Sequence, residues 1–264
     1  MKNNYDILVI DDEQVIIDSV RKIAGSENYT VDSADNATDA LAKLDKYSHS
    51  LIICDIMMPE IDGFEFLEIM NRKKNSTPII MTTGYTTVEN AVNSLSKGAL
   101  GFLPKPFTID ELLSVIFRGL RFNDLRNEMQ NEENSGMVFV PCPSKYRRLG
   151  YSSWMNMEED GTVLFGATDL YFKTIEQVKR INFYEIDEKV SQGNIGIKFE
   201  TIDELNHHLL CPVSGRIIEI NSSLENDISI LEKDPYFKGW LYRIIPTDLE
   251  YDIKNLVQCG SDNM

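Results

Sequence analysis

Five side chains in the first half of the chain have the types that phosphoryl chemistry needs: three carboxylates, a hydroxyl and an ammonium. They are Asp11, Asp12, Asp55, Thr83 and Lys105. Carboxylates held close together repel one another unless a cation joins them, and oxygen ligands with room for water suit Mg²⁺. The metal and the Lys105 ammonium would neutralise the oxygens of a phosphoryl group, and the Asp55 carboxylate could attack it as the nucleophile.

Each of these side chains also has an ordinary structural interpretation. Paired aspartates often cap helices, and an aspartate shortly before Pro59 suits a turn. The shared position of the five decides between the interpretations, because each follows a short apolar run. If these runs are parallel strands, their carboxyl ends converge on one crevice, so the combination favours a functional site.

The first 121 residues alternate short apolar runs with segments of helical spacing. The predicted strands are 5–10, 29–34, 51–54, 79–81 and 99–103, and the predicted helices are 15–24, 37–44, 64–70, 88–95 and 109–120. Thr108 and Glu111 form a capping box before the last helix. This pattern predicts an α/β fold for domain 1–121, with a five-stranded parallel, doubly wound sheet covered on both faces.

The pattern changes after residue 121. Residues 122–136 are polar and are interpreted as a linker, although they could continue the last helix for a few turns. Residues 137–264 are predicted to form a β-rich domain with peripheral helices. Its predicted strands are 162–165, 195–199, 216–220 and 239–245, and its predicted helices are 169–181, 222–230 and 249–257.

Composition narrows the range of partners and compartments. The 264 residues include 26 Lys and Arg against 42 Asp and Glu, for a formal charge of −16. This balance argues against non-specific binding to nucleic acid or to anionic membranes. The apolar runs are too short for a signal peptide or a membrane span. We therefore expect a cytoplasmic protein with reduced thiols at Cys54, Cys142, Cys211 and Cys259.

Residues 1–121 resemble the receiver domain of bacterial two-component response regulators. The segments that carry the resemblance are ILVIDDE (7–13), LIICDIMMPEIDG (51–63), PIIMTTG (78–84) and ALGFLPKPF (99–107). The resemblance implies that Asp55 accepts a phosphoryl group from a sensor histidine kinase or a phosphotransfer protein. It also implies a cis Lys105–Pro106 peptide bond and a possible homodimer formed through the receiver.

The resemblance also assigns metal ligands. Asp12 and Asp55 would bind Mg²⁺, or Mn²⁺, directly. The backbone carbonyl of Met57 and a water held by Asp11 would complete the site, while Lys105 would contact the phosphoryl group.

Thr83 and Phe102 would be the switch pair of this domain. A phosphoryl oxygen on Asp55 would accept a hydrogen bond from the Thr83 hydroxyl, and Phe102 could rotate into the space that Thr83 leaves. Met57 and Tyr85 would flank the phosphoryl group. Neither of them orients a water as an acid or an amide would, so we expect a long-lived aspartyl phosphate.

Residues from about 154 to 245 resemble the H protein of the glycine cleavage system, a lipoyl-carrying hammerhead domain. The segments that carry this resemblance are CPVSGRIIEIN (211–221) and DPYFKGWL (234–241), with shorter matches at Trp154, FGATD (165–169) and VSQG (190–193). The resemblance implies a hammerhead fold for the β-rich domain.

The lysine that carries lipoate in the H-protein family is missing at the matching position. It belongs to a Glu-Ser-x-Lys-like motif, and the comparable run here is FETIDE (199–204), which places Asp203 or Glu204 at the lysine position. A carboxylate cannot form the lipoyl amide, and Lys198 lies on the wrong side of the motif. No lipoate is therefore expected, and the domain is interpreted as a binding module.

Two further features have mainly structural interpretations. His207 and His208, with Cys211 and Glu204, could suggest a metal site, but adjacent residues of an extended chain point to opposite sides. Cys54 is expected to be a small buried hydrophobe.

The combined expectation is a signalling protein rather than an enzyme, with no chemistry beyond Mg²⁺-dependent phosphorylation and dephosphorylation of itself. Phosphorylation of Asp55 would switch an H-protein-like output domain that binds an unidentified protein partner, with no direct binding to nucleic acid or membrane. The alternatives are a lipoyl carrier gated by phosphorylation and a scaffold that does not depend on phosphorylation.

Overall fold

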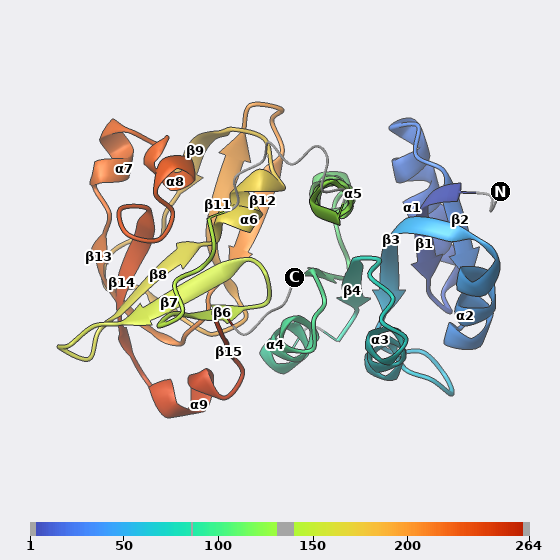
Figure 1. Cartoon of the computed structure of the whole chain (residues 1–264), viewed down its shortest axis with the longest axis horizontal. Coiled ribbons are helices and arrows are strands. Elements are labelled where there is room, and N and C mark those ends of the chain that lie inside the picture. Colours follow the sequence, from blue (N-terminus) through green and yellow to red (C-terminus); the bar gives the residue numbers. More distant parts are fainter. Residues whose placement is uncertain (1–3, 86, 131–139, 261–264) are drawn as a thin grey trace. The chain divides into compact units, whose positions relative to one another are not determined.

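The computed structural model describes residues 4–85, 87–130 and 140–260 (Figure 1). The chain divides into two compact units. One consists of Met1–Thr86 with Lys97–Ser135, and the other of Thr87–Ser96 with Gly136–Met264. Within the described residues, no helix is both long and apolar enough to cross a membrane.

The first unit is built on a parallel sheet whose strands are ordered β2-β1-β3-β4-β5. The strands are β1 (Asn4–Ile10), β2 (Val31–Ala34), β3 (Ser48–Asp55), β4 (Ile79–Thr83) and β5 (Gly101–Pro104). The central strands are buried along almost their whole apolar runs, as expected for a sheet covered on both faces. Ile10 pairs with Cys54, and Cys54 with Met81, so the strands end level with one another. The predicted parallel α/β sheet is confirmed.

Five helices accompany these strands along the chain. They are α1 (Gln14–Ser26), α2 (Ala37–Lys46), α3 (Gly63–Arg72), α4 (Val88–Ser96) and α5 (Ile109–Gln130). The capping box before α5 is confirmed, because Thr108 N–H donates to Glu111 Oε2 (2.8 Å) and Glu111 N–H donates to Thr108 Oγ1 (3.3 Å). Helix α5 also takes in the first nine residues of the predicted linker, 122–130. The rest of that linker, residues 131–136, lies outside the described residues.

The C-terminal unit contains two antiparallel sheets. The larger has the strand order β10-β13-β14-β8-β7-β6-β15, and the smaller has the order β12-β11-β9. The larger sheet comprises β6 (Arg147–Leu149), β7 (Ser153–Met157), β8 (Val163–Ala167), β10 (Lys189–Val190), β13 (Gly215–Ile220), β14 (Trp240–Pro246) and β15 (Val257–Gln258). The smaller comprises β9 (Val178–Asn182), β11 (Ile195–Thr201) and β12 (Asn206–Leu210). The prediction of a β-rich domain is confirmed.

The helices of this domain are shorter than the predicted ones. They are α6 (Asp169–Lys173), α7 (Ser223–Asn226), α8 (Ile230–Lys233) and α9 (Leu249–Ile253). The predicted helix 169–181 is wrong in its second half, because β9 pairs with β11 there. The predicted helix 222–230 is broken where the Asp227 carboxylate accepts the N–H of Ser229 (3.0 Å) and starts a new turn. The predicted helix 249–257 gives way to β15, which pairs with β6.

One end of the larger sheet is organised around Trp154. Its indole is fully buried, and its Nε1–H donates to the carbonyl of Ala167 (2.8 Å). A Cβ at Gly166 would lie 2.4 Å from the indole ring, so this position of β8 needs a glycine. Tyr146 and Tyr236 pack against the same indole. This aromatic cluster of Tyr146, Trp154 and Tyr236 joins the first two strands of the domain to the segment between α8 and β14.

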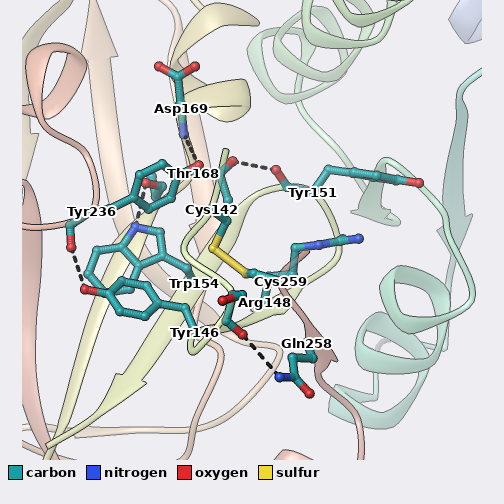
Figure 2. The surroundings of a disulfide bond; sticks show 12 residues. Cys142, Tyr146, Arg148, Tyr151, Trp154, Thr168, Asp169, Tyr236, Gln258 and Cys259 are labelled. Atoms are coloured by element: carbon teal, nitrogen blue, oxygen red, sulfur yellow. Dashed lines mark hydrogen bonds between the residues drawn. A yellow bond between two sulfur atoms is a disulfide. The ribbon is translucent and has the colours of Figure 1, made fainter. Parts of the chain in front are cut away.

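The expectation of four reduced thiols is wrong for two of the cysteines. Cys142 and Cys259 form a disulfide beside the aromatic cluster (Figure 2). They are 117 residues apart in sequence, but pairing of β15 with β6 brings their Cα atoms within 5.5 Å. Cys54 and Cys211 are free and buried, so the prediction of a buried, hydrophobic Cys54 is confirmed.

Candidate functional site

Lys105 lies between two buried carboxylates at the C-terminal ends of the parallel strands. Its Nζ is 2.7 Å from Asp11 Oδ2 and 2.7 Å from Asp55 Oδ1. The exposed fractions of these side chains are 8% for Lys105, 0% for Asp11 and 4% for Asp55. The structure therefore brings together three of the five residues that the sequence placed at this edge of the sheet.

Local backbone contacts orient the two carboxylates. Asp11 follows β1, and its Oδ1 accepts the N–H of Glu13 (3.0 Å) just before α1 begins. Asp55 ends β3, and its Oδ2 accepts the N–H of Met57 (2.6 Å). One oxygen of each carboxylate is thus held by the backbone, and the other faces Lys105.

The loop after Asp55 depends on a close backbone approach. Gly63 N–H donates to the Ile56 carbonyl (2.9 Å), and a Cβ at Gly63 would lie 2.2 Å from the Asp55 carbonyl oxygen. Only glycine permits this approach, which closes the loop between β3 and α3. The loop then presents the Met57 side chain to solvent.

Lys105 is placed by the strand beside β3. Its N–H donates to the Thr83 carbonyl (2.8 Å), which fixes the chain just after β5. The peptide bond between Lys105 and Pro106 is cis, as predicted. Glu13 was not among the predicted site residues, yet its Oε1 lies 3.5 Å from Lys105 Nζ. Its place directly after Asp11 and Asp12 was the signal that could have found it.

Burial and charge act together on the ionisation of this cluster. Burial raises the pKa of Asp11, although the neighbouring Lys105 ammonium acts in the opposite direction. For Lys105, burial alone would lower the pKa, but hydrogen bonds and attraction from Asp11 and Asp55 raise it overall. Lys105 therefore stays protonated at neutral pH and supplies a fixed cation next to Asp55.

The remaining predicted residues lie around this centre in different environments. Asp12 is exposed, whereas Thr83 is fully buried and its Oγ1 accepts the N–H of Tyr85 (3.1 Å). Phe102 is half-buried on β5 and packs against the core on one side of the sheet. The switch between Thr83 and Phe102 stays a prediction.

The donor set suits a magnesium ion. Carboxylate and carbonyl oxygens are the ligands that Mg²⁺ prefers, and the carboxylates of Asp11 and Asp55 are both buried at this edge of the sheet. Within the described ranges, however, no group of three or more His, Cys, Asp or Glu side chains is close enough to hold a metal. Lys105 lies between Asp11 and Asp55 instead. The predicted ligand set of Asp12, Asp55, Met57 and Asp11 therefore stays a prediction.

The hairpin that joins β11 and β12 carries the positions compared with the lipoyl lysine. Thr201 N–H donates to the Leu205 carbonyl (3.1 Å), and Glu204 N–H donates to the Thr201 carbonyl (3.0 Å). The Asp203 carboxylate accepts the Thr201 hydroxyl and, at 3.4 Å, the N–H of Leu205. Glu204 has a φ of 66°, which is the left-handed conformation that follows a turn in three-residue hairpins. Asp203 therefore holds the turn together.

Comparisons with known proteins agree with both halves of this description. The family model for the response regulator receiver domain matches residues 7–117, and the model for the glycine cleavage H-protein matches residues 145–262. The chain joins a receiver domain to a glycine cleavage H-protein domain. The two models match separate parts of the sequence, as the two resemblances implied.

Individual relatives match one domain at a time. For the receiver domain, the nitrogen assimilation regulatory protein NtrX of Azorhizobium caulinodans is 35% identical over 48% of this chain and 28% of its own length. The chain thus spans little more than a quarter of that relative. For the H-protein domain, the probable glycine cleavage system H protein of Thermococcus kodakarensis is 33% identical over 39% of this chain and 76% of its own length.

A solved structure matches the receiver domain along its whole length. It is a CheY-like receiver domain protein from Methanospirillum hungatei, with 33% identity over 48% of this chain and 99% of that chain, and a TM-score of 0.43.

The H-protein domain keeps the histidines of β12 apart. His207 is buried and His208 is half-buried, in the alternating pattern of that strand. His207 pairs with Phe199 and His208 with Lys198 across the β11–β12 ladder. Lys198 therefore lies within the strand rather than at the hairpin tip.

Proposed function

We propose that this protein is a two-component response regulator that accepts a phosphoryl group on Asp55. The observation that carries the proposal is the buried Lys105 ammonium, 2.7 Å from Asp55 Oδ1 and 2.7 Å from Asp11 Oδ2. This arrangement sets a nucleophilic carboxylate beside a permanent cation at the end of a rigid strand. The donor would be the phosphohistidine of a sensor kinase or phosphotransfer protein.

The chemistry of transfer follows from these positions. A carboxylate oxygen of Asp55 attacks phosphorus, and the bond between phosphorus and the donor imidazole breaks as the new P–O bond forms. The imidazole leaves and takes up a proton. The Lys105 ammonium turns from the Asp55 carboxylate to the phosphoryl oxygens and offsets their charge. The Met57 N–H, 2.6 Å from Asp55 Oδ2, holds the carboxylate in place during the attack.

Mg²⁺ would be held by Asp12, Asp55 and the Met57 carbonyl, with Asp11 acting through water. When bound, it supplies positive charge to the equatorial oxygens of the transferring group. Lys105, now 2.7 Å from Asp11 Oδ2, would have to give up part of this contact if the ion were bound there.

The H-protein domain is proposed as an output module that binds a protein partner rather than as a lipoyl carrier. Support comes from the hairpin tip, where Asp203 is engaged with Thr201 and Leu205 and no lysine is present. A carboxylate cannot form the amide that attaches lipoate. Without the lipoyl lysine, the domain keeps its fold and its surface, which suit recognition of a partner rather than group transfer.

The test is the intact mass of the purified full chain before and after treatment with Mg²⁺ and acetyl phosphate. We expect a gain of one phosphoryl group, absent from Asp55→Ala and retained in Asp45→Ala, whose side chain is an exposed carboxylate. The starting mass should show no lipoyl group. An unmodified chain after treatment would contradict the phosphoacceptor, and a lipoyl adduct at the outset would contradict the output module.

A further inference from the structure

The disulfide connects the two ends of the H-protein domain. Cys142 lies just after the described domain begins at residue 140, and Cys259 lies just after β15 (Figure 2). The Cα separation of 5.5 Å is typical of a disulfide, so the backbone needs no movement to form the bond. Cys142 is half-buried, whereas Cys259 is buried with an exposed fraction of 2%.

Besides the disulfide, β15 is held by a short strand pairing, by the buried side chain of Leu256 just before it, and by Gln258, whose Nε2 donates to the Ser144 carbonyl (3.2 Å). β15 is the outermost strand of the larger sheet, and its register with β6 consists of Val257 opposite Arg148 and Gln258 opposite Arg147. The Cys259 N–H also donates to the Tyr146 carbonyl (3.0 Å). A two-residue edge strand is too short to be stable on its own. The covalent bond therefore reinforces a short edge pairing.

The disulfide also covers the aromatic cluster. Cys259 packs with Tyr146, Trp154 and Tyr236, and Cys142 adjoins the same group. The Tyr146 hydroxyl donates to the Tyr236 carbonyl (2.9 Å), and the Tyr236 hydroxyl accepts the N–H of Asp169 (3.1 Å). Release of Cys259 would open one side of this cluster to water without disturbing its internal hydrogen bonds.

The entry of the chain into the domain is tied to the same place. The Val140 N–H donates to Asp169 Oδ2 (2.9 Å), two residues before Cys142. Asp169 in turn donates its own N–H to Tyr236 in the aromatic cluster. The bond between Cys142 and Cys259 thus links the C-terminal strand to the segment through which the domain is joined to the rest of the chain.

The number and burial of the cysteines favour a single reversible disulfide over a set of disulfides that stabilise the fold. The chain has four cysteines, and the other two, Cys54 and Cys211, are fully buried in separate cores. Frameworks that stabilise small domains use several disulfides and little core, whereas this domain has an extensive core. No competing thiol is exposed, so exchange is confined to one pair.

We propose that Cys142 and Cys259 form a reversible thiol–disulfide lock, which holds β15 on the edge of the H-protein domain when oxidised and releases it when reduced. The molecules that would act on this bond are a dithiol, which reduces it, and a disulfide, which oxidises the two thiols. The proposal does not depend on phosphorylation of Asp55.

Each direction of the exchange balances. In reduction, a thiolate of the dithiol attacks the half-buried Cys142 sulfur, the Cys142–Cys259 bond breaks, and Cys259 leaves as a thiolate that takes up a proton. The second thiol of the reductant then attacks the mixed disulfide and releases Cys142. The protein gains two electrons and two protons, and the reductant becomes its own disulfide. In oxidation, the Cys142 thiolate attacks glutathione disulfide and releases one glutathione, and the Cys259 thiolate then attacks the mixed disulfide at Cys142 and releases the second. Two electrons and two protons pass from the protein to the two glutathione molecules.

The experiment uses the full chain after equilibration with glutathione disulfide or with dithiothreitol. Intact mass after thiol alkylation under native and denaturing conditions counts the thiols, and hydrogen exchange compares the two forms. We expect the reduced form to gain two alkylation sites. We also expect several-fold faster exchange in peptides covering residues 145–149 and 255–260, with receiver peptides such as 48–55 unchanged.

Cys142→Ser is the matched variant, because it removes the bond at the half-exposed partner without opening the core. It should exchange like the reduced wild type and should not respond to dithiothreitol. The wild type under reduction serves as an independent comparison should the variant fold poorly. The proposal is overturned if glutathione disulfide does not oxidise the pair, or if the oxidised and reduced wild type exchange at the same rate in both peptides.

Discussion

Lys105 Nζ lies 2.7 Å from Asp55 Oδ1, and both side chains are almost completely buried. A buried ion pair adds little net stability compared with an apolar pair, but removal of one partner leaves an uncompensated buried charge. Here the loss of Lys105 would leave two carboxylates, Asp11 and Asp55, facing each other. The position is therefore sensitive for folding as well as for phosphoryl transfer.

We predict that Lys105→Ala lowers the free energy of unfolding of the receiver domain by about 3 kcal/mol, because two buried carboxylates lose their cation. Added Mg²⁺ should recover part of this loss, since a divalent cation can take over the role of the ammonium. Urea unfolding with and without Mg²⁺, followed by hydrogen exchange of receiver peptides, measures both effects.

Lys97→Ala is the matched control for this change. Lys97 pairs with Glu68 on the surface, and both side chains are substantially exposed. Solvent screens exposed pairs, so this variant should unfold close to wild type and should not respond to Mg²⁺. An equal loss of unfolding free energy in both variants would show that burial of Lys105 does not make it more important for stability than an exposed lysine.

Sequence patterns were sufficient for the receiver because its strands are uninterrupted apolar runs. Runs such as 7–10 and 51–54 are typical of strands buried on both faces of a parallel sheet, and the polar residue after each run marks the strand end. Asp11, Asp55 and Lys105 could therefore be placed at one edge before any coordinates. The position of Lys105 between the two carboxylates could not be predicted in this way, because side-chain positions depend on the packed backbone of neighbouring strands.

In the H-protein domain, the sequence was less informative because its elements are short and paired with distant partners. Residues 174–181 have apolar positions compatible with a helix, but pairing with β11 makes 178–182 a strand. Similarly, Val257 and Gln258 form a strand only because β6 offers them an edge. The disulfide depends on that same pairing, so the reduced state expected from cysteine number alone was wrong.

Glu204 is predicted to be replaceable by glycine with a gain in stability. Its φ of 66° is unfavourable for a residue with a Cβ, and glycine removes that cost while increasing the entropy of the unfolded chain. The net gain in the free energy of unfolding of the H-protein domain should be about 0.5–1 kcal/mol. The two tryptophans of the chain, Trp154 and Trp240, belong to this domain and report its thermal unfolding.

Asp203→Ala tests the same hairpin in the opposite direction. It removes the Asp203 acceptor of the Thr201 hydroxyl, which keeps the Leu205 carbonyl (3.1 Å), and it also removes the acceptor of the Leu205 N–H, so it should cost about 1 kcal/mol. A stabilising Asp203→Ala, or a destabilising Glu204→Gly, would contradict the turn described here.

The aspartyl phosphate is predicted to be long-lived because of the residues around it. Met57 is 55% exposed and Tyr85 is 69% exposed on the loops beside Asp55 and Thr83. Neither side chain offers a carboxylate or an amide that could orient an attacking water. The phosphorylated protein, freed of phosphodonor, should keep its added mass for many minutes.

Met57→Asn introduces an amide at the same exposed position, and it should shorten the lifetime of the phosphoryl group by roughly tenfold. Met57→Leu keeps the apolar character and should leave the lifetime unchanged. Decay of the wild-type phosphate within seconds would contradict the prediction.

Acid should weaken the receiver through a buried histidine. His49 stacks on Tyr5, and its Nε2 lies 3.2 Å from Asp32 Oδ2. Burial lowers the pKa of His49, and the nearby positive charge of Lys43 lowers it further. The hydrogen bond to Asp32 raises it, but the overall shift is downward. The unfolded chain therefore binds a proton at a higher pH than the folded chain does, and stability falls as the pH drops below about 6.5.

Protonation of Asp32 causes a second loss of receiver stability at lower pH. Burial would raise the pKa of Asp32, but hydrogen bonds from Lys43 and His49 lower it overall, so the stability it contributes is present above its unfolded pKa and lost as the pH falls through the folded one. His49→Gln should remove the pH dependence of stability near neutrality. The loss of stability at lower pH that comes from protonation of Asp32 should remain. We expect the free energy of unfolding of the receiver to decline less between about pH 7 and 5 in this variant. His208→Gln, in the other domain, should decline as the wild type does, and equal slopes for all three proteins would exclude His49 as the source.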